Sequence, residues 1–285
     1  MKFAIDIPNH TGDYADVRLV AEVAHEAEEA GWDGFFVWDH IGANWGESHV
    51  SDPWIMLTAI ALKTEHMRIG PMVTPVPRRR PWKLAREIVT LDHLTNGRLV
   101  LGVGIGAGAE YTGYHEPGSD KEHGAMLDEG LEVLMHLWSG EAFDFHGQYY
   151  QLDNIRHLPR PVQQQPRIPI WVAGNWPNKK PMQRAARWDG VFPLGQDSGF
   201  SEQMSTTAIR ECLAYIRAQQ SPERASQPYD VLNYGLLEGK DKVADAALVE
   251  TYAEAGVTWW VENIRWERGS LQEQREYIRK GPPRT

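Results

Sequence analysis

The chain has 285 residues, of which 42% are hydrophobic and 24% are charged, so we expect a folded protein with a large core. Its formal net charge of −10 argues against nucleic acid or an anionic membrane as partner, because both bind clustered Lys and Arg. The three consecutive arginines at 78–80 are too few to form such a cluster. The single cysteine, Cys212, excludes an internal disulfide and a thiolate metal cluster.

Short apolar runs alternate with helix-forming patterns along the chain. Eight runs predict buried strands, at 2–7, 34–38, 68–73, 98–106, 168–174, 190–194, 229–237 and 257–264. Apolar residues at helical spacing predict helices between them, at 17–30, 54–63, 81–94, 127–138, near 182, and at 209–216 and 248–252. Eight strands alternating with helices predict an α/β fold, a (β/α)8 TIM barrel.

No Ser/Gly-rich linker divides the chain, so we expect a single barrel domain over 1–285. Two segments after the fourth strand fall outside the alternation: a lid-like insertion at 108–123 and a hairpin at 141–152. The tail 280–285 is expected to be frayed. The N-terminus lacks the pattern of a signal peptide, and no apolar run approaches the ~20 residues of a membrane helix, so a cytoplasmic protein is expected.

Asp39 and His40 directly follow the second strand, and ligand sites in such barrels lie at the C-terminal ends of the strands. Neighbouring residues of a strand point to opposite faces, so only one of the two is expected to look down the barrel axis. A histidine titrates near neutrality and can act as a base or a hydrogen-bond donor. The alternative is structural: Asp39 caps the following turn and His40 packs under the loop.

Glycines alternate along the fourth strand, at 102, 104, 106 and 108. Residues 104–109 satisfy the pattern G-x-G-x-x-A of a dinucleotide-binding turn, but that turn belongs after a first strand with a helix opening at once. Here it follows the fourth strand, and 110–120 reads as loop, so we reject that interpretation. Either the small residues let a flat ligand lie against the barrel wall, or the interior tapers there. Glu110, just beyond, is either a site carboxylate or a solvated loop residue.

The fifth strand ends in Ala173 and Gly174, and a short turn leads to a helix with Pro181 in its first turn. Backbone N–H groups at such a helix start, with Lys179 and Lys180, would form an anion site; the alternative is an ordinary connection with solvated lysines.

Several strand ends carry tryptophans, Trp38, Trp45 and Trp176, which suggest an aromatic-lined cavity or large core side chains. No HExxH, GxSxG or Walker motif is present, and no metal site is expected.

Four stretches together resemble the luciferase-like flavin-dependent oxidoreductases, which include bacterial luciferase, alkanesulfonate monooxygenase and deazaflavin-dependent dehydrogenases and reductases. They run in the family's order from about residue 27 to 194: AEEAGWDGFFVWDHI, RIGPMVTPVPRRRPWKLAREIVTLDHLTNGRLVLGVGIGAGAEY, LDEGLEVLMHLWSGEAFDFHGQYYQL and LPRPVQQQPRIPIWVAGNWPNKKPMQRAARWDGVFPL. The resemblance implies a (β/α)8 barrel with a flavin or deazaflavin ring at its C-terminal mouth. It also implies a homodimer.

The resemblance implies that His40 is catalytic, with Asp39 and Glu110 beside it, as in the family's sugar-phosphate dehydrogenase branch. It places a bulge or a non-proline cis peptide near Met72 and Val73, under the ring. The implied cofactor-binding residues are Met72, Val73, Thr74 and Gly106, with Ala173, Gly174 and Asn175 in the loop after the fifth strand at the cofactor phosphate. Trp45 and Trp176 are expected in the substrate pocket. The insertion after Glu110 is short, so that branch's specificity for a sugar phosphate is not carried over.

The primary expectation is therefore a flavin-dependent monooxygenase that uses reduced FMN and O2 on a small organic substrate. His40 would act as proton donor or base, oriented by Asp39 or Glu110. One alternative is a dehydrogenase or reductase that transfers hydride with the deazaflavin coenzyme F-420. A second alternative is a barrel that binds flavin without turnover. A metal-dependent barrel hydrolase is a further alternative, which elemental analysis would exclude if no stoichiometric metal copurifies.

Overall fold

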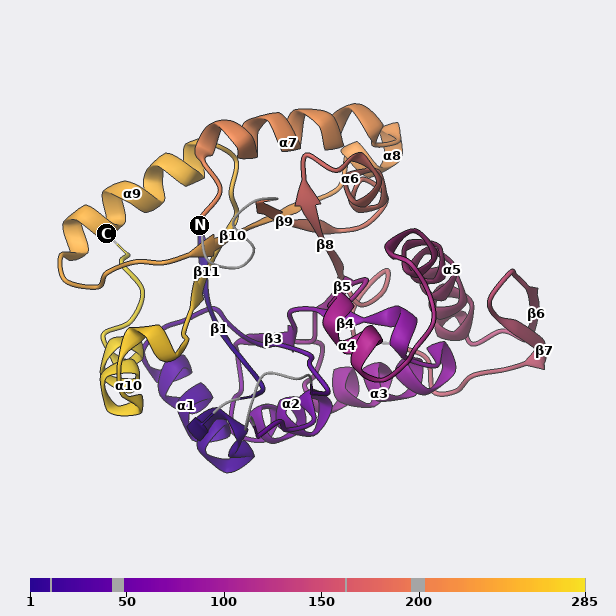
Figure 1. Cartoon of the computed structure of the whole chain (residues 1–285), viewed down its shortest axis with the longest axis horizontal. Coiled ribbons are helices and arrows are strands. Elements are labelled where there is room, and N and C mark those ends of the chain that lie inside the picture. Colours follow the sequence, from indigo (N-terminus) through magenta and orange to yellow (C-terminus); the bar gives the residue numbers. More distant parts are fainter. Residues whose placement is uncertain (11, 43–48, 162, 196–202, 285) are drawn as a thin grey trace.

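The computed structural model describes residues 1–10, 12–42, 49–161, 163–195 and 203–284, and it is a barrel of parallel strands with helices outside (Figure 1). The strands are β1 (Lys2–Ile7), β2 (Gly34–Val37), β3 (Arg68–Pro71), β4 (Thr74–Pro75), β5 (Leu101–Gly104), β8 (Ile170–Trp176), β9 (Gly190–Gly195), β10 (Asp230–Gly235) and β11 (Trp259–Asn263). Their order is β3-β2-β1-β11-β10-β9-β8-β5-β4, and every neighbouring pair in that sheet is parallel.

The sheet closes on itself through β3 and β5. Ile69 forms a parallel bridge with Leu99, and the Ile69 carbonyl accepts a 2.9 Å hydrogen bond from Val100 N. β3 lies within the strand expected at 68–73 and β4 follows just beyond its end, so a strand is present at each of the eight predicted places. The predicted TIM-barrel fold is therefore confirmed.

The predicted helices are present, and most begin at a side chain that caps them. Asp16 accepts hydrogen bonds from two backbone N–H groups of α1, and Asp52 does the same for α2, where Pro53 occupies the first turn. The helices are α1 (Val17–Glu29), α2 (Pro53–Ala61), α3 (Pro81–Leu94), α5 (Asp120–Ser139), α6 (Lys179–Ala185), α7 (Thr206–Gln219), α9 (Lys242–Glu254) and α10 (Leu271–Arg279), with short α4 (Gly108–Gly113) and α8 (Pro222–Ala225). Among the described residues, none of them has the length and apolar character needed to cross a bilayer.

The barrel interior is filled by side chains that alternate along each strand, since successive residues point to opposite faces. The cluster inside comprises Ala4, Phe36, Met72, Val100, Trp171, Phe192, Leu232, Tyr234, Trp259 and Val261. A larger apolar cluster lies between the strands and the surrounding helices. The barrel is therefore a packed core, and a ligand can bind only at one of its ends.

Three segments differ from the expectations. The insertion at 108–123 contains α4 and the start of α5, so it is largely helical and not a loop. The tail was expected to be frayed over 280–285, but its described part, 280–284, is packed: Pro282 and Pro283 are buried, and Arg284 pairs with Asp33. α10 was not predicted, although Ser270 and Glu273 form a capping box at its start.

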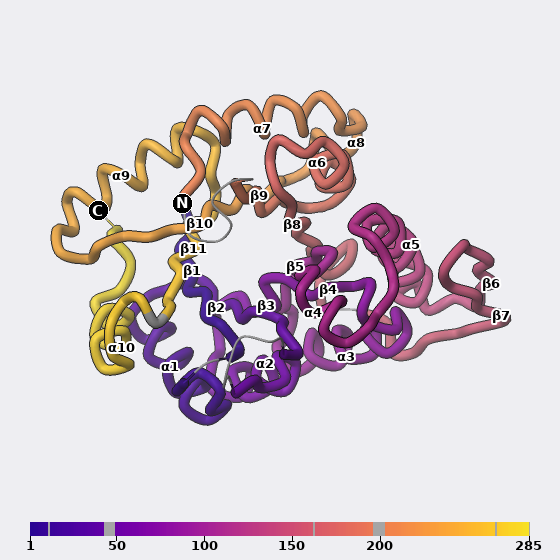
Figure 2. The backbone as a smooth tube through the Cα atoms, viewed as in Figure 1, coloured from indigo at the N-terminus to yellow at the C-terminus, as the bar shows by residue number. Residues whose placement is uncertain are grey.

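The expected hairpin is present as β6 (Phe143–His146) and β7 (Gln151–Ile155), so it begins two residues and ends three residues later than predicted. It projects from the side of the molecule beyond α5 (Figure 2). Glu129 of α5 holds its turn by accepting hydrogen bonds from the backbone N–H groups of Gln148, Tyr149 and Tyr150.

Candidate active site at the barrel mouth

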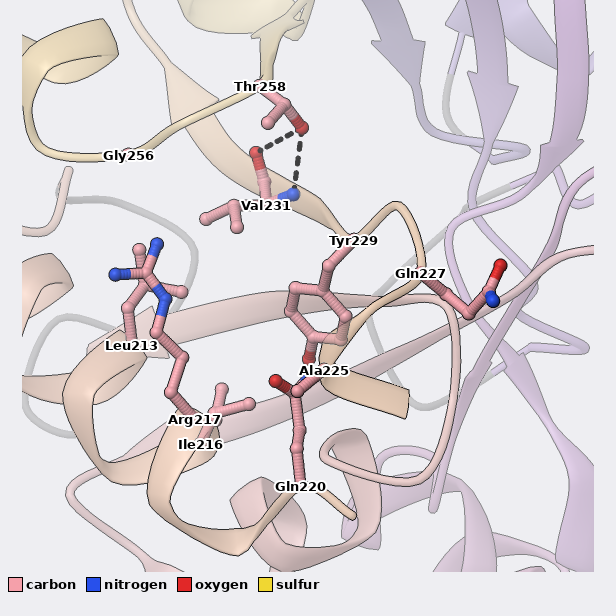
Figure 3. A pocket seen from close by; sticks show the side chains of 10 residues that line it. All are labelled: Leu213, Ile216, Arg217, Gln220, Ala225, Gln227, Tyr229, Val231, Gly256 and Thr258. Carbon is pink, nitrogen blue, oxygen red and sulfur yellow. Dashed lines mark hydrogen bonds between the residues drawn. The ribbon is translucent and has the colours of Figure 1, made fainter. Parts of the chain in front are cut away.

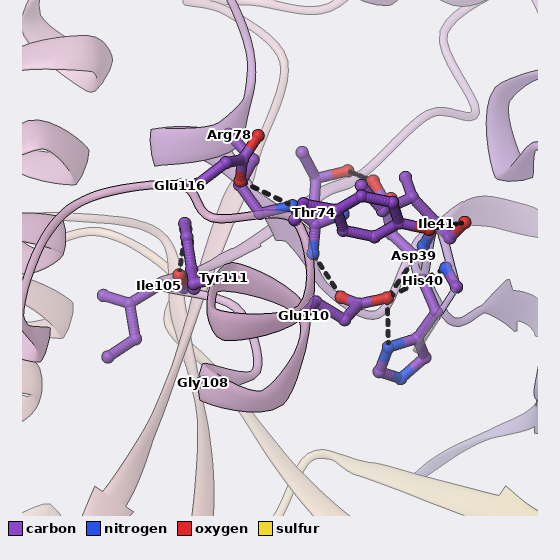
Figure 4. Close-up of polar contacts among 12 residues, drawn as sticks. Asp39, His40, Ile41, Thr74, Arg78, Ile105, Gly108, Glu110, Tyr111 and Glu116 are labelled. Atoms are coloured by element: carbon purple, nitrogen blue, oxygen red, sulfur yellow. Dashed lines mark hydrogen bonds and ion pairs between the residues drawn. The ribbon is translucent and has the colours of Figure 1, made fainter. Parts of the chain in front are cut away.

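His40 and Glu110 meet at the C-terminal end of the barrel (Figure 4). His40 lies three residues beyond β2, and Glu110 lies in the first turn of α4, beyond β5. His40 Nδ1 is 3.4 Å from Glu110 Oε1, and the two side chains are 17% and 1% exposed. The same Oε1 accepts hydrogen bonds from Ile41 N (2.9 Å) and Gly42 N (3.1 Å). The carboxylate therefore holds both the imidazole and the main chain that follows it.

Arg78, at the end of the short 3-10 helix Val76–Arg78, completes the arrangement by pairing with the other oxygen of Glu110. Burial alone raises the pKa of Glu110, but the opposing effects of His40 and Arg78 outweigh it and lower that pKa to about 2. Glu110 is thus an anion at any ordinary pH. A carboxylate beside Nδ1 favours a proton there, which leaves Nε2 of His40 as the acceptor.

Asp39 belongs to a different network. Its carboxylate accepts hydrogen bonds from Arg79 at 2.7 and 2.8 Å and from the Thr74 hydroxyl at 2.7 Å, and it is 5% exposed. This network ties the end of β2 to β4 and to the segment that follows it. The structure thus brings Glu110, and not Asp39, to the ring of His40.

The other neighbours of His40 come from the ends of β1 and β2. The ring of Trp38 is 5.8 Å from that of His40, and the ring of His10 is 5.3 Å away, in an edge-on arrangement. Burial, and then the proximity of His40, lowers the pKa of His10 to about 4, so His10 is neutral at pH 7. Asn9 contacts the main chain of His40.

The interior of the barrel ends at its mouth in an apolar floor, formed by four partly buried side chains that pack on the interior cluster: Trp38, Val73, Ala173 and Leu194. They come from the residue directly after β2, the segment between β3 and β4, β8 and β9. A floor of this kind, with His40 and Glu110 at its edge, suits a flat aromatic ring that needs hydrogen bonds only around its rim. The residues present therefore fit a flavin or deazaflavin ring, which the family resemblance implies.

Beneath this floor lies a buried acid. Asp6 Oδ2 accepts hydrogen bonds from Trp38 Nε1 (2.7 Å) and Asn263 Nδ2 (3.4 Å), and the residue is fully buried. Burial raises the pKa of Asp6 well above its ordinary value, despite these hydrogen bonds. The Asp6 carboxyl thus holds the indole of Trp38 from below.

The glycine series of β5 serves the packing of the barrel wall. A Cβ on Gly102 would lie 2.3 Å from the carbonyl oxygen of Pro71, and one on Gly104 would lie 2.7 Å from Val73 Cγ2. Gly106 has φ +89°, and a Cβ there would approach Pro75 at 2.9 Å. The first three glycines of the series thus permit close packing against the third strand and the chain after it, and both interpretations left open for the series remain predictions.

The residues predicted under the ring lie at the mouth. The peptide bond between Met72 and Val73 is cis, at the position the resemblance indicated. Met72 is buried in the interior cluster, Val73 contributes to the floor, and the Thr74 hydroxyl is committed to Asp39.

The residues expected to bind the cofactor phosphate are placed differently from the prediction. Ala173, Gly174 and Asn175 lie within β8 and not in a loop after it, because β8 pairs with β9 as far as Trp176 and Gly195. A Cβ on Gly174 would lie 2.2 Å from Pro181, so this glycine allows the start of α6 to pack on the strand.

The anion site expected at the start of α6 stays a prediction. The helix has only seven residues, and the Lys179 ammonium lies 4.1 Å from the ring of Trp176 and 4.3 Å from that of Tyr215. Trp176 is half-buried at the end of β8, whereas Trp45 lies outside the described residues.

A cavity of about 380 Å³ lies at the other end of the barrel, beside the N-terminal ends of β10 and β11 (Figure 3). It is lined by Leu213, Ile216, Arg217, Gln220, Ala225, Gln227, Tyr229, Val231, Gly256 and Thr258. None of the residues predicted to function lines it. Within the described part of the chain, no group of three His, Cys, Asp or Glu side chains is placed to hold a metal ion.

Sequence reasoning missed Arg78, Arg79 and Asn9. The arginines were weighed only as a basic run, although they follow the third strand and so lie at the mouth. Asn9 follows the first strand in the same way. Position after a strand was the available signal for all three.

Comparisons with known proteins find similarity to flavin-dependent and coenzyme F-420-dependent enzymes. A model of the luciferase-like monooxygenase family matches residues 1–227. The F-420-dependent glucose-6-phosphate dehydrogenase of Amycolatopsis mediterranei is 33% identical over 171 residues, which cover 56% of this chain and 48% of that protein. The oxygenase component of a flavin-dependent trigonelline monooxygenase from Acinetobacter baylyi is 32% identical over 161 residues, 55% of this chain and 43% of that protein.

The chain thus spans about half the length of these curated relatives. Among solved structures, the coenzyme F-420-dependent tetrahydromethanopterin reductase of Methanopyrus kandleri superposes with a TM-score of 0.75 at 16% identity, over 98% of this chain and 96% of that one. This likeness shows a shared fold.

Proposed function

The chain belongs to the luciferase-like monooxygenase family, whose members use FMN or coenzyme F-420, and on that premise we propose that it is a dehydrogenase that transfers hydride from a hydroxyl-bearing small molecule to coenzyme F-420. The observation that carries the proposal is the 3.4 Å contact between His40 Nδ1 and the ionised Glu110. It makes His40 Nε2 a proton acceptor at the mouth.

Oxidation of an alcohol needs such an acceptor. As the carbon loses its hydrogen with the bonding electron pair, the hydroxyl oxygen must lose its proton for the C=O bond to form. Bound coenzyme F-420 supplies the acceptor of the hydride. His40 Nε2 takes the proton, and Glu110 stabilises the imidazolium that results. Arg78 holds Glu110 in place from the other side, and the apolar floor excludes water from the reacting atoms.

Oxygenation with reduced FMN, the primary expectation from the sequence, remains the second candidate. The apolar floor of Trp38, Val73, Ala173 and Leu194 is the observation that favours it, because oxygen chemistry on a reduced flavin requires a site from which water is excluded. A relative described as a flavin-dependent monooxygenase supports it too. A paired His40 and Glu110 is less essential to that chemistry than to alcohol oxidation, which is why we place it second.

The test compares the two cofactors on the same preparation. The protein is titrated with F-420 and with FMN and then assayed without oxygen on a panel of small alcohols and glucose 6-phosphate, following F-420 reduction by its absorbance. In parallel, reduced FMN is supplied in air and oxygen consumption is followed. Reduction of F-420 that falls at least about 100-fold in His40→Gln supports the proposal. Substrate-dependent oxygen use with FMN alone overturns it in favour of the second candidate, and tight binding without turnover favours a non-catalytic barrel.

The matched control is His157→Gln. His157 is buried, at 8% exposure, in the segment that follows β7 and has no contact with His40 or Glu110 in the described structure. Its substitution is expected to leave F-420 reduction unchanged. An equal loss in both variants would mean that His40→Gln acts through folding, and the proposal would lose its support.

A further inference from the structure

Asn9 is a fully buried asparagine two residues beyond β1, and its side-chain amide is bonded on both sides. Its Nδ2 donates to the carbonyl oxygen of His40 at 2.7 Å, and its Oδ1 accepts from His40 N at 3.2 Å. The amide thus pairs with both main-chain groups of one residue. It makes the pair of hydrogen bonds that the main chain of a neighbouring strand would make, at a point where β1 and β2 have ended.

The regular pairing of β1 with β2 ends at Ile7 and Val37, followed by one hydrogen bond from Trp38 N to Ile7 O at 3.0 Å. His40 lies two residues further on. Asn9 therefore extends the register of the barrel wall to the residue that carries the imidazole. Glu110, from α4, then meets the ring from the other side.

Asn9 also binds the main chain of Ser51, through its side-chain amide and through its own carbonyl group. Nδ2 donates to Ser51 O at 2.7 Å, and Ser51 N donates to Asn9 O at 2.9 Å. Both Nδ2 protons and Oδ1 are thus used, and a buried amide with this many partners is costly to replace. No side chain lacking the amide can make the three contacts.

We propose that Asn9 is a positioning residue that fixes His40 through its main chain and so keeps Nδ1 on Glu110 and Nε2 toward the substrate. The inference rests on the proposed function of His40 as the base. A displacement of about 1 Å in a reacting group can cost about 100-fold in rate, so loss of this anchor lowers turnover even though Asn9 does not touch substrate.

The experiment uses Asn9→Ala in the full chain, with Asn233→Ala as the matched control. Asn233 is 2% exposed, lies on β10, and donates from Nδ2 to Tyr234 O at 3.2 Å. The first readout is ¹⁵N NMR of histidine-labelled protein, in which the His40 ring is identified as the signal absent from His40→Gln. The second is kcat and KM of the reaction found with F-420 or FMN.

In Asn9→Ala, the two ring-nitrogen shifts of His40 are expected to converge, because the fixed tautomer is lost, and kcat to fall about 10- to 100-fold with KM changed less than about twofold. Asn233→Ala is expected to leave both unchanged at a comparable loss of stability. Unchanged shifts in Asn9→Ala, unchanged kcat, or equal changes in the control would overturn the inference.

The NMR readout needs no turnover. If neither cofactor supports a reaction, the proposed function has failed and the ring shifts alone decide the role of Asn9. Should Asn9→Ala not fold, Asn9→Ser, which keeps one donor and one acceptor, is expected to give an intermediate change in the same direction; a wild-type spectrum from it would contradict the inference.

Discussion

Asp39 and His40 are adjacent in the chain, yet their side chains bind two different partners: Asp39 binds Arg79 and His40 contacts Glu110. The alternation of an extended chain separates them, since neighbouring side chains point to opposite faces. Asp39 consequently joins β2 to the segment after β4, whereas His40 faces the residue at the start of α4. Of the carboxylates of Asp39 and Glu110, only that of Glu110 is in contact with the imidazole of His40.

This separation predicts different effects for two isosteric substitutions. In Glu110→Gln, kcat is expected to fall about 100-fold or more, because a neutral amide cannot stabilise the protonated ring. In Asp39→Asn, the main loss is in the free energy of unfolding, since Arg79 loses its charged partner. Steady-state kinetics and urea unfolding on both variants measure the contrast.

Glu129→Gln is the control, because Glu129 also accepts several backbone hydrogen bonds but holds the hairpin, away from the mouth. It is expected to lower stability without lowering kcat. If Asp39→Asn reduced kcat as much as Glu110→Gln at equal stability, the assignment of separate roles would be wrong.

The depressed pKa of Glu110 predicts a pH dependence of stability. The folded-state pKa of about 2 lies below the ordinary value of 4.5, so the ionised form contributes stability above pH 4.5, and this contribution is lost as the pH falls toward 2. Glu110→Gln does not titrate. The stability difference between wild type and Glu110→Gln should therefore be largest at pH 6–7, about 3 kcal/mol or more, and should shrink by pH 3. A difference that stays constant across this range in urea unfolding would contradict the assignment.

The barrel could be predicted from the sequence because its strands are buried on both faces and so appear as short apolar runs. α10 could not be found in that way, since only Gln274 and Ile278 among its residues are buried and its pattern is mostly polar. α4 was missed because it has six residues, two of them glycine.

The sequence allowed single residues of the site to be predicted, but not the contacts between them. The rule that ligands bind beyond the C-terminal ends of the strands identified His40 and Glu110 separately. Their contact depends on how the first turn of α4 crosses toward β2, which no local pattern encodes. The same holds for Arg78, whose partner is 32 residues away, and for Asn9, whose partner is 31 residues away.

The close approach of β5 to the third strand predicts that Gly102→Ala destabilises the barrel. The new methyl group would lie 2.3 Å from the carbonyl oxygen of Pro71, a backbone atom that cannot turn aside. We expect a loss of about 1–3 kcal/mol in the free energy of unfolding. Gly113→Ala in α4 is the control: no atom lies within 4 Å of its Cβ, and the change is expected to be neutral or mildly stabilising. An equal change in the free energy of urea unfolding in Gly102→Ala and Gly113→Ala would show that the approach of Pro71 does not restrict the size of the residue at 102.

The buried acid Asp6 predicts a gain of stability on removal of its charge. Because its folded-state pKa is raised, folding is most favourable below the unfolded-state pKa and weakens as the pH rises toward the folded-state value, by about 1.4 kcal/mol per pH unit. Asp6→Asn keeps an oxygen to accept from Trp38 Nε1 and does not titrate. It should therefore match wild type near pH 4 and be more stable at pH 8.

Asp6→Leu separates the charge from the hydrogen bond. It also removes the titrating group, but it takes away the oxygen that accepts from the indole N–H of Trp38. Its free energy of unfolding at pH 8 should therefore be about 1–3 kcal/mol lower than that of Asp6→Asn. Because Trp38 belongs to the floor at the mouth, Asp6→Leu should also weaken cofactor binding in a fluorescence titration, whereas Asp6→Asn should not. An Asp6→Asn protein less stable than wild type at pH 8 would mean that the pKa of Asp6 is not raised in the folded state, and that its hydrogen bonds outweigh its burial.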